Sequence, residues 1–219
     1  MSSSNPSGEK SAFTERGVED YERRRYRGLD QRIVHAREVR LIKKYLRMIR
    51  EAAGSALPRG PALDLPCGYG RFSGLLMSDG WPLVNSDLSL EMVRRTMGRS
   101  GAAGAVSNAK KGLPFASRAF GLIFSVRFFH HVHDPADRAA ILREFRRVSE
   151  GWAIVSFYRA NAFHRIQRRL RRLFHKSRTN IKMIEPGTFE GEARAAGFEV
   201  VRVKPLFRGL HAYHLALLK

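Results

Sequence analysis

The stretch that decides the fold is Pro61-Ala-Leu-Asp-Leu-Pro-Cys-Gly-Tyr-Gly-Arg-Phe-Ser-Gly74. The apolar residues at 62–65 predict a short buried strand, and the apolar spacing over 71–78 predicts a helix. Between them, Gly68 and Gly70 predict a tight turn, because a side chain at either position would block close approach to the backbone. An α/β sheet uses this order of strand, glycine turn and helix to bind a nucleotide-like ligand.

Strand-like and helix-like runs alternate after this stretch, which is typical of βαβ units and a parallel sheet. Near the end of the chain, two segments that alternate apolar and polar residues predict an antiparallel hairpin. The predicted strands are 62–65, 83–86, 104–107, 122–126, 152–157, 198–203 and 211–218, and the predicted helices are 71–78, 89–97, 135–148 and 188–196.

The composition of the 219 residues bounds the class of protein. That length suits one larger domain with a single core. No apolar run approaches the roughly 20 residues needed to span a bilayer, and the Ser-rich start lacks the apolar region of a secretory signal. Cys67 is the single cysteine, so no internal disulfide can form. We therefore expect a cytoplasmic protein.

The charge balance is strongly basic. Forty Lys and Arg against twenty Asp and Glu give a formal net charge of +20. A positive field of this size favours anionic partners: nucleic acid, acidic lipid headgroups or a phosphorylated substrate. The alternative is a genome-wide preference for arginine, in which case the charges only solvate helix surfaces.

The acidic residue Asp87 follows the second predicted strand, 23 residues after Asp64. An acid near this spacing meets the ribose of a bound nucleotide in α/β folds, because its carboxylate can accept hydrogen bonds from both sugar hydroxyls. The alternative is a helix N-cap, a role that Asp87 or Ser89 could serve.

Several stretches in the right order resemble the motifs of class I S-adenosylmethionine-dependent methyltransferases of the small-molecule and lipid type. Residues 64–70 resemble the first motif, D-x-G-x-G-x-G, and Asp87 matches the acid after the second strand. Further along, residues 112–125 resemble "LPF…FDLV", 129–132 "LHHL", 144–156 "E…RVLKPGG" and 197–198 "GF". The family's fold is a Rossmann-like, mostly parallel seven-stranded sheet with an antiparallel C-terminal hairpin and helices on both faces.

The resemblance implies S-adenosylmethionine as cofactor and a role for each matching residue. Gly68, Gly70 and the backbone at Cys67 would face its methionine part. Asp64 would orient the turn or hold the amino group, and Asp87 would take the ribose. The remaining expected contacts are Leu88 against adenine, Asn108 and Ala109 at its edge, and Ser125 with Val126 as the pocket floor.

Three residues depart from the family pattern. Pro66 replaces the first glycine of the motif, and Gly121 replaces the frequent aspartate of "FD". Asn108 stands where an acid often receives the adenine amino group, and an amide oxygen can accept the same hydrogen bond.

Histidines follow the fourth predicted strand, where the acceptor is expected to enter. His131, or else His130, could take a proton from a hydroxyl acceptor as a general base. The alternative is that both side chains only pack beneath the cofactor. Cys67 lies in the cofactor turn and is not expected to be a nucleophile. No Cys and His residues have metal-ligand spacing, so no metal is predicted.

A basic segment at 161–176 has one apolar face and one arginine face at helical spacing. It has three interpretations: a lid whose arginines touch an anionic substrate, a helix on an acidic membrane surface, or an arm that follows nucleic-acid phosphates. The arginines expected to contact the anion are Arg165, Arg168, Arg169 and Arg172.

These features predict a disordered tail at 1–12, an N-terminal helical cap at 13–56, and a methyltransferase domain at 57–219 with a basic helical insert at 159–185. The predicted activity is methyl transfer from S-adenosylmethionine to a small or lipid-linked, anionic acceptor, in the cytoplasm or at the inner membrane surface. The alternatives are an RNA methyltransferase and a non-catalytic module that binds nucleic acid or membrane.

Overall fold

The computed structural model describes residues 29–54, 57–159, 183–207 and 212–219. The helices are α3 (Leu29–Ala52), α4 (Ser73–Ser78), α5 (Leu90–Ser100), α6 (Pro135–Val148) and α8 (Thr188–Ala195), with a short 3-10 helix, η1, at Phe129–His131. The strands are β1 (Ala62–Asp64), β2 (Leu83–Asp87), β3 (Ala103–Val106), β4 (Phe120–Ser125), β5 (Ser149–Tyr158), β6 (Val200–Pro205) and β7 (Tyr213–Leu218).

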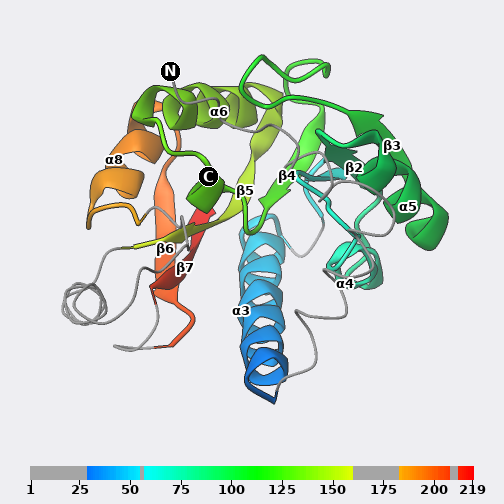
Figure 1. Ribbon diagram of the computed structural model, residues 1–219, viewed down its shortest axis with the longest axis horizontal. Coiled ribbons are helices and arrows are strands. Elements are labelled where there is room, and N and C mark those ends of the chain that lie inside the picture. Colours follow the sequence, from blue (N-terminus) through cyan, green and yellow to red (C-terminus); the bar gives the residue numbers. More distant parts are fainter. Residues whose placement is uncertain (1–28, 55–56, 160–182, 208–211) are drawn as a thin grey trace, which may run out of the picture.

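The strands form one seven-stranded sheet in the order β3-β2-β1-β4-β5-β7-β6 (Figure 1). Strands β1 to β5 pair in parallel, and β7 pairs antiparallel with both β5 and β6. The predicted fold class is thereby confirmed, hairpin included. The strand order reverses at β1, with β2 on one side and β4 on the other, and ligands bind at such a switch point in open α/β sheets.

Both faces of the sheet are covered by helices, so the core has two halves. One half packs α6, α8 and η1 on the sheet, and the other packs α3 and α4 on the opposite face. Alternate residues of β4 show the division, because Ile123 belongs to the first half while Leu122 and Phe124 belong to the second. Strands covered on both faces are apolar throughout in this way.

Helix α3 is a layer of the same core. Ile42, Tyr45 and Ile49 have no exposed surface, and their spacing places them on one face of the helix. The Tyr45 hydroxyl also donates to the Leu215 carbonyl at 3.1 Å. Much of the segment 13–56 is therefore integral to the domain, while residues 1–28, including the predicted tail, lie outside the described residues.

Several of the family-like motifs hold the scaffold rather than the site. Glu144 of α6 accepts a hydrogen bond from the Leu113 backbone at 2.8 Å, and Arg147 donates to the carbonyls of Leu113 and Phe115 at 2.9 and 2.8 Å. The absence of a side chain at Gly121 allows the backbone at Arg59 to lie close to β4, because a Cβ at Gly121 would lie 2.6 Å from the Arg59 carbonyl oxygen. No side chain, aspartate included, would fit at that position.

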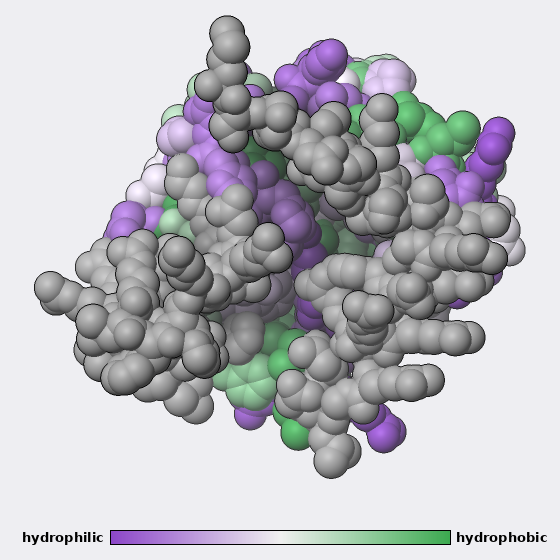
Figure 2. All heavy atoms as spheres, in the orientation of Figure 1, coloured by the Kyte–Doolittle hydropathy of each residue, from purple (hydrophilic) through white to green (hydrophobic). Residues whose placement is uncertain are grey.

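The surface is not uniformly charged. Figure 2 shows hydrophobic residues beside hydrophilic ones at the upper right, where Figure 1 places α5 and β3. Leu90 and Met97 of α5 and Val106 of β3 are exposed. Among the described helices, none is both long and apolar enough to cross a membrane.

Candidate cofactor and acceptor site

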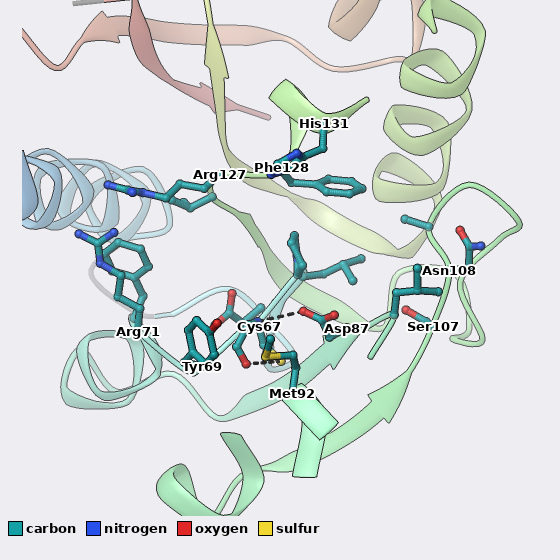
Figure 3. A pocket seen from close by; sticks show the side chains of 18 of the residues that line it. Cys67, Tyr69, Arg71, Asp87, Met92, Ser107, Asn108, Arg127, Phe128 and His131 are labelled. Carbon is teal, nitrogen blue, oxygen red and sulfur yellow. Dashed lines mark hydrogen bonds between the residues drawn. The ribbon is translucent and has the colours of Figure 1, made fainter. Parts of the chain in front are cut away.

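A pocket of about 710 Å³ lies at the carboxyl ends of β1, β2, β3 and β4 (Figure 3). The strand ends supply its lining because each strand passes directly into a turn there. Of the predicted site residues, those that line it are Asp64, Cys67, Gly68, Asp87, Leu88, Asn108, Ala109, Val126, His130 and His131. Ten positions spread over the sequence thus come together in one cavity.

Gly68 is locked between two elements. Its backbone N–H donates to Oδ2 of Asp87 at 3.0 Å, and its carbonyl accepts from the Thr96 hydroxyl at 2.7 Å. Its φ of +50° is in the left-handed region that glycine adopts without strain. A Cβ at this position would touch nothing within 4 Å, so the open space above Gly68 belongs to the pocket.

Gly70 serves the turn in a different way. It does not line the pocket, and a Cβ there would lie 2.8 Å from Cγ2 of Thr96. The absent side chain therefore allows the turn to pack on α5 rather than on the ligand. Thr96 is fully buried and anchors the turn, a role that the sequence reasoning missed because no motif includes this residue.

Asp87 aims its carboxylate at the glycine turn. Oδ1 accepts from the Ser89 N–H and Oδ2 from the Gly68 N–H, both at 3.0 Å. Each oxygen can accept a second hydrogen bond, as a sugar diol requires. The N-cap of α5 is Ser89, whose side chain accepts from Met92. Burial raises the pKa of Asp87, and backbone hydrogen bonds from Ser89 and Gly68 limit the rise.

Asp64 is buried beside the same turn. Burial, and then the charge of Asp87, raise its pKa well above the ordinary value. Two neighbouring carboxyls in a desolvated place favour a cationic group between or beside them. The same surroundings act on Cys67, because burial first and then Asp64 and Asp87 raise the pKa of its thiol. The thiol is therefore protonated at neutral pH, which agrees with its not being a nucleophile.

The β3 side of the pocket carries the residues expected at the adenine. Leu88 is 66% exposed, whereas Ala109 is buried. The side-chain oxygen of Asn108 accepts from the Lys110 N–H at 3.0 Å, so the amide is held by its own turn. Figure 3 shows Ser107 and Asn108 together on this side.

The pocket floor differs from the prediction at one residue. Val126 lines the pocket, but Ser125 does not, because it is the last residue of β4 and has no exposed surface. Its hydroxyl has no hydrogen-bond partner among the described residues. A direct contact between Ser125 and a ligand is thus not supported by its position.

The two histidines differ in exposure. His130 is buried and its ring lies 5.1 Å from that of Tyr158, whereas His131 is exposed. Their rings lie 3.9 Å apart. Figure 3 shows His131 with Phe128 on the wall opposite Cys67 and Asp87. Of the two, the His131 side chain is therefore the more accessible to a bound molecule.

The side of the pocket nearest α3 holds a charged cluster that no sequence motif indicated. Fully buried Glu38 accepts from Nε and Nη2 of Arg127 at 3.2 and 3.1 Å, and its Oε2 lies 3.0 Å from Nη2 of Arg71. The Tyr213 hydroxyl donates to the same carboxylate at 2.5 Å, and Arg71 donates to Nδ1 of His35 at 2.7 Å. We call these five residues the Glu38 cluster.

Three members of the Glu38 cluster have shifted pKa values. Burial acts to lower the pKa of Arg127, but the charge and hydrogen bonds of Glu38 outweigh it and raise this pKa. Burial, and then the charge of Arg71, lower the pKa of His35, so its ring is neutral and accepts from Arg71. The pKa of Tyr213 is raised by burial and by Glu38, which keeps its hydroxyl protonated.

The predicted anion-binding arginines of the insert, Arg165, Arg168, Arg169 and Arg172, lie outside the described residues. Within the described residues, no group of three or more His, Cys, Asp and Glu could hold a metal ion.

Comparison with known proteins agrees with this geometry. Residues 63–155 match the family model of a methyltransferase domain. These residues therefore carry a methyltransferase domain. The sequence prediction of family, enzyme class and cofactor is thereby confirmed. No curated protein matches the sequence.

Solved structures share the fold of this methyltransferase domain over nearly the whole chain. The magnesium protoporphyrin IX methyltransferase of Synechocystis with bound SAH has a TM-score of 0.76 at 15% identity, covering 98% of this chain and 99% of that one. The same enzyme with bound SAM has a TM-score of 0.68 at 13% identity, covering 100% and 98%. A methyltransferase of Thermotoga maritima, described as a possible histamine N-methyltransferase, has a TM-score of 0.61 at 20% identity, covering 95% and 98%.

Proposed function

We propose that this protein transfers the methyl group of S-adenosylmethionine to a small-molecule acceptor that binds between the glycine turn and the wall of Phe128 and His131. One observation carries the proposal. The Asp87 carboxylate faces the Gly68 turn inside a pocket of about 710 Å³, a volume within the range of cofactor sites.

The residues of the pocket fit the cofactor by their chemistry. Asp87 has acceptor capacity for a ribose diol, and the exposed Leu88 side chain offers an apolar surface to a base. Asp64, buried beside the turn, favours a neighbouring ammonium group. When bound, the cofactor supplies a methyl group on an electron-poor sulfonium.

The protein's own task in the reaction is to hold the acceptor in line and exclude water. A base is needed only when the acceptor atom carries a tightly held proton. We assign that task to His131, because it is exposed, lines the pocket and rests against the buried His130. His130 then acts as a positioning residue.

A lipid, membrane or RNA acceptor has no support in the described residues or in the related proteins, since the basic insert that suggested these partners lies outside the described residues. Methylation of a small molecule is therefore the function proposed. A cytoplasmic location stays a prediction.

The test combines binding and transfer. Calorimetric titration with S-adenosylhomocysteine should show one site per chain. Incubation with methyl-labelled cofactor and cell extract fractionated into small molecules, lipid, RNA and protein should place the label in the small-molecule fraction. His131→Gln should slow that transfer while leaving S-adenosylhomocysteine affinity unchanged. Absence of binding, or label confined to RNA or lipid, would refute the proposal.

A further inference from the structure

Arg127 is an unusual residue of the pocket wall. It lies two residues after the end of β4, lines the pocket, and has a φ of +62°. This left-handed conformation is uncommon and strained for a residue with a long side chain. The backbone N–H is fixed by a hydrogen bond to the Ser156 hydroxyl at 2.6 Å. Strain of this kind persists where the surroundings determine a conformation that function needs.

The guanidinium of Arg127 is only partly used by Glu38. The two hydrogen bonds occupy its side-on edge, Nε with Nη2, and Nη1 takes no part in them. A guanidinium can bind a second carboxylate or phosphate through its end-on edge, which pairs Nη1 with the second hydrogen of Nη2. Because the side chain is 19% exposed, an anion there would be held in partly desolvated surroundings.

The acidic and basic residues of the pocket lie on different sides of it. Asp64 and Asp87 are the last residues of β1 and β2, beside the glycine turn. Arg71 and Arg127 lie on the α3 side of the pocket (Figure 3). Glu38 divides its single negative charge between Arg71 and Arg127. It also lies behind them and does not line the pocket, so the arginines are what a ligand meets on this side.

We propose that Arg127, with Arg71 beside it, binds a carboxylate or phosphate group of the methyl acceptor at the α3 side of the pocket. The proposal rests on the proposed methyl transfer and narrows its substrate to small anions. Glu38 fixes the position of both guanidinium groups, and the pocket lining includes the Phe128 ring as a surface for an apolar acceptor body. The same charge would exclude cationic acceptors.

The test uses two probes of equal shape on the complex with S-adenosylhomocysteine. Benzoate carries the charge, and benzamide is its neutral counterpart. Benzoate should bind at least about tenfold more tightly than benzamide, because hydrogen bonds to charged groups are stronger than neutral ones. Arg127→Met should remove this preference and leave benzamide binding unchanged.

Lys110→Met is the matched control, because Lys110 also lines the pocket but lies after β3, on the side of Asn108. It should keep the benzoate preference. Glu38→Gln covers the case in which Arg127→Met fails to fold. It removes the internal negative charge, so benzoate should bind more tightly, a gain that a merely structural arginine pair would not produce.

Four results would overturn the proposal: equal binding of the two probes, binding of neither, an equal loss in Lys110→Met, or benzoate binding only without S-adenosylhomocysteine. The last would assign the arginines to the cofactor's own carboxylate. If S-adenosylhomocysteine itself fails to bind, the proposed methyl transfer fails instead, and a benzoate preference of the free protein would still report the anion subsite.

Discussion

The two ends of the pocket are built by different physical means. At the strand ends, the Asp87 carboxylate accepts hydrogen bonds from the backbone N–H groups of Gly68 and Ser89, in the turns that follow β1 and β2. On the α3 side, Glu38, Arg127 and Tyr213 come from separate elements, and the Glu38 carboxylate holds the other two by an ion pair and a hydrogen bond. The first end joins positions at most 28 residues apart, on two neighbouring strand ends and α5. The second exists only once α3 has packed on the sheet.

The largest expected effect of a substitution is a loss of stability on the α3 side of the pocket. Glu38→Ala would leave two guanidinium groups without their buried counter-charge and the Tyr213 hydroxyl without its acceptor. The free energy of unfolding should fall by about 3–5 kcal/mol. Urea unfolding measures it, with Glu38→Gln as the milder control. A loss below about 1 kcal/mol would mean that the cluster does not hold α3.

The next largest effect is expected at the strand-end side of the pocket. Asp87→Ala removes the acceptor proposed for the ribose hydroxyls and releases the Gly68 and Ser89 N–H groups. S-adenosylhomocysteine should bind about 100-fold more weakly, or about 3 kcal/mol, as expected for lost hydrogen bonds to a charge. Asp87→Asn, which keeps one acceptor oxygen, should lose less. An unchanged calorimetric Kd would show that Asp87 does not contribute to cofactor binding.

Alanine substitutions at the two glycines of the turn should differ in which property they change most, stability or cofactor binding. Both have positive φ, so alanine costs about 1–2 kcal/mol of stability at either position. Gly70→Ala adds a clash with Thr96 and should lower stability further, by about 1–3 kcal/mol. Gly68→Ala should instead weaken S-adenosylhomocysteine binding, because its methyl group enters the pocket. Thermal unfolding and S-adenosylhomocysteine titration of both variants test this difference. It is contradicted if Gly68→Ala loses more stability than Gly70→Ala, or if Gly70→Ala loses more affinity than Gly68→Ala.

A pH effect should follow from Asp64. Because its pKa is raised in the folded protein, the folded state binds the proton more tightly than the unfolded state. Its contribution to stability is therefore greatest below pH 3.8 and is lost as the pH rises through the raised pKa. Asp64→Asn should be more stable than the natural protein at pH 8, and the difference should shrink toward pH 4. A difference independent of pH would refute this explanation.

The smallest effect is expected at Ser125. Its buried hydroxyl has no described partner and lies beneath the pocket, so Ser125→Ala should change S-adenosylhomocysteine affinity by less than about twofold, since burying an unsatisfied hydroxyl gives no benefit. A tenfold loss would restore the sequence prediction that this residue contacts the cofactor.

The sequence predicted the sheet and the strand-end residues because their signals are local. Asp87 and Gly68 each follow a strand within a few residues, so a spacing rule finds them. The same rule could not tell Gly68 from Gly70, because the difference lies in Thr96, which comes 26 residues after Gly70 in the chain.

The α3 side could not be predicted from spacing, because Glu38 and Tyr213 are 175 positions apart. One signal was present. Glu38 falls on the same helix face as Ile42, Tyr45 and Ile49, and a charge on an apolar face indicates a buried partner. Which arginines would meet it depends on tertiary packing, and nothing local names them.

The most direct test of the division of the pocket is one titration series with S-adenosylhomocysteine. Arg127→Met should keep the wild-type Kd within about twofold, whereas Asp87→Ala should lose about two orders of magnitude, as expected for a charged hydrogen-bond acceptor. Equal losses in the two variants would contradict the assignment of cofactor to the strand ends and acceptor to the α3 side.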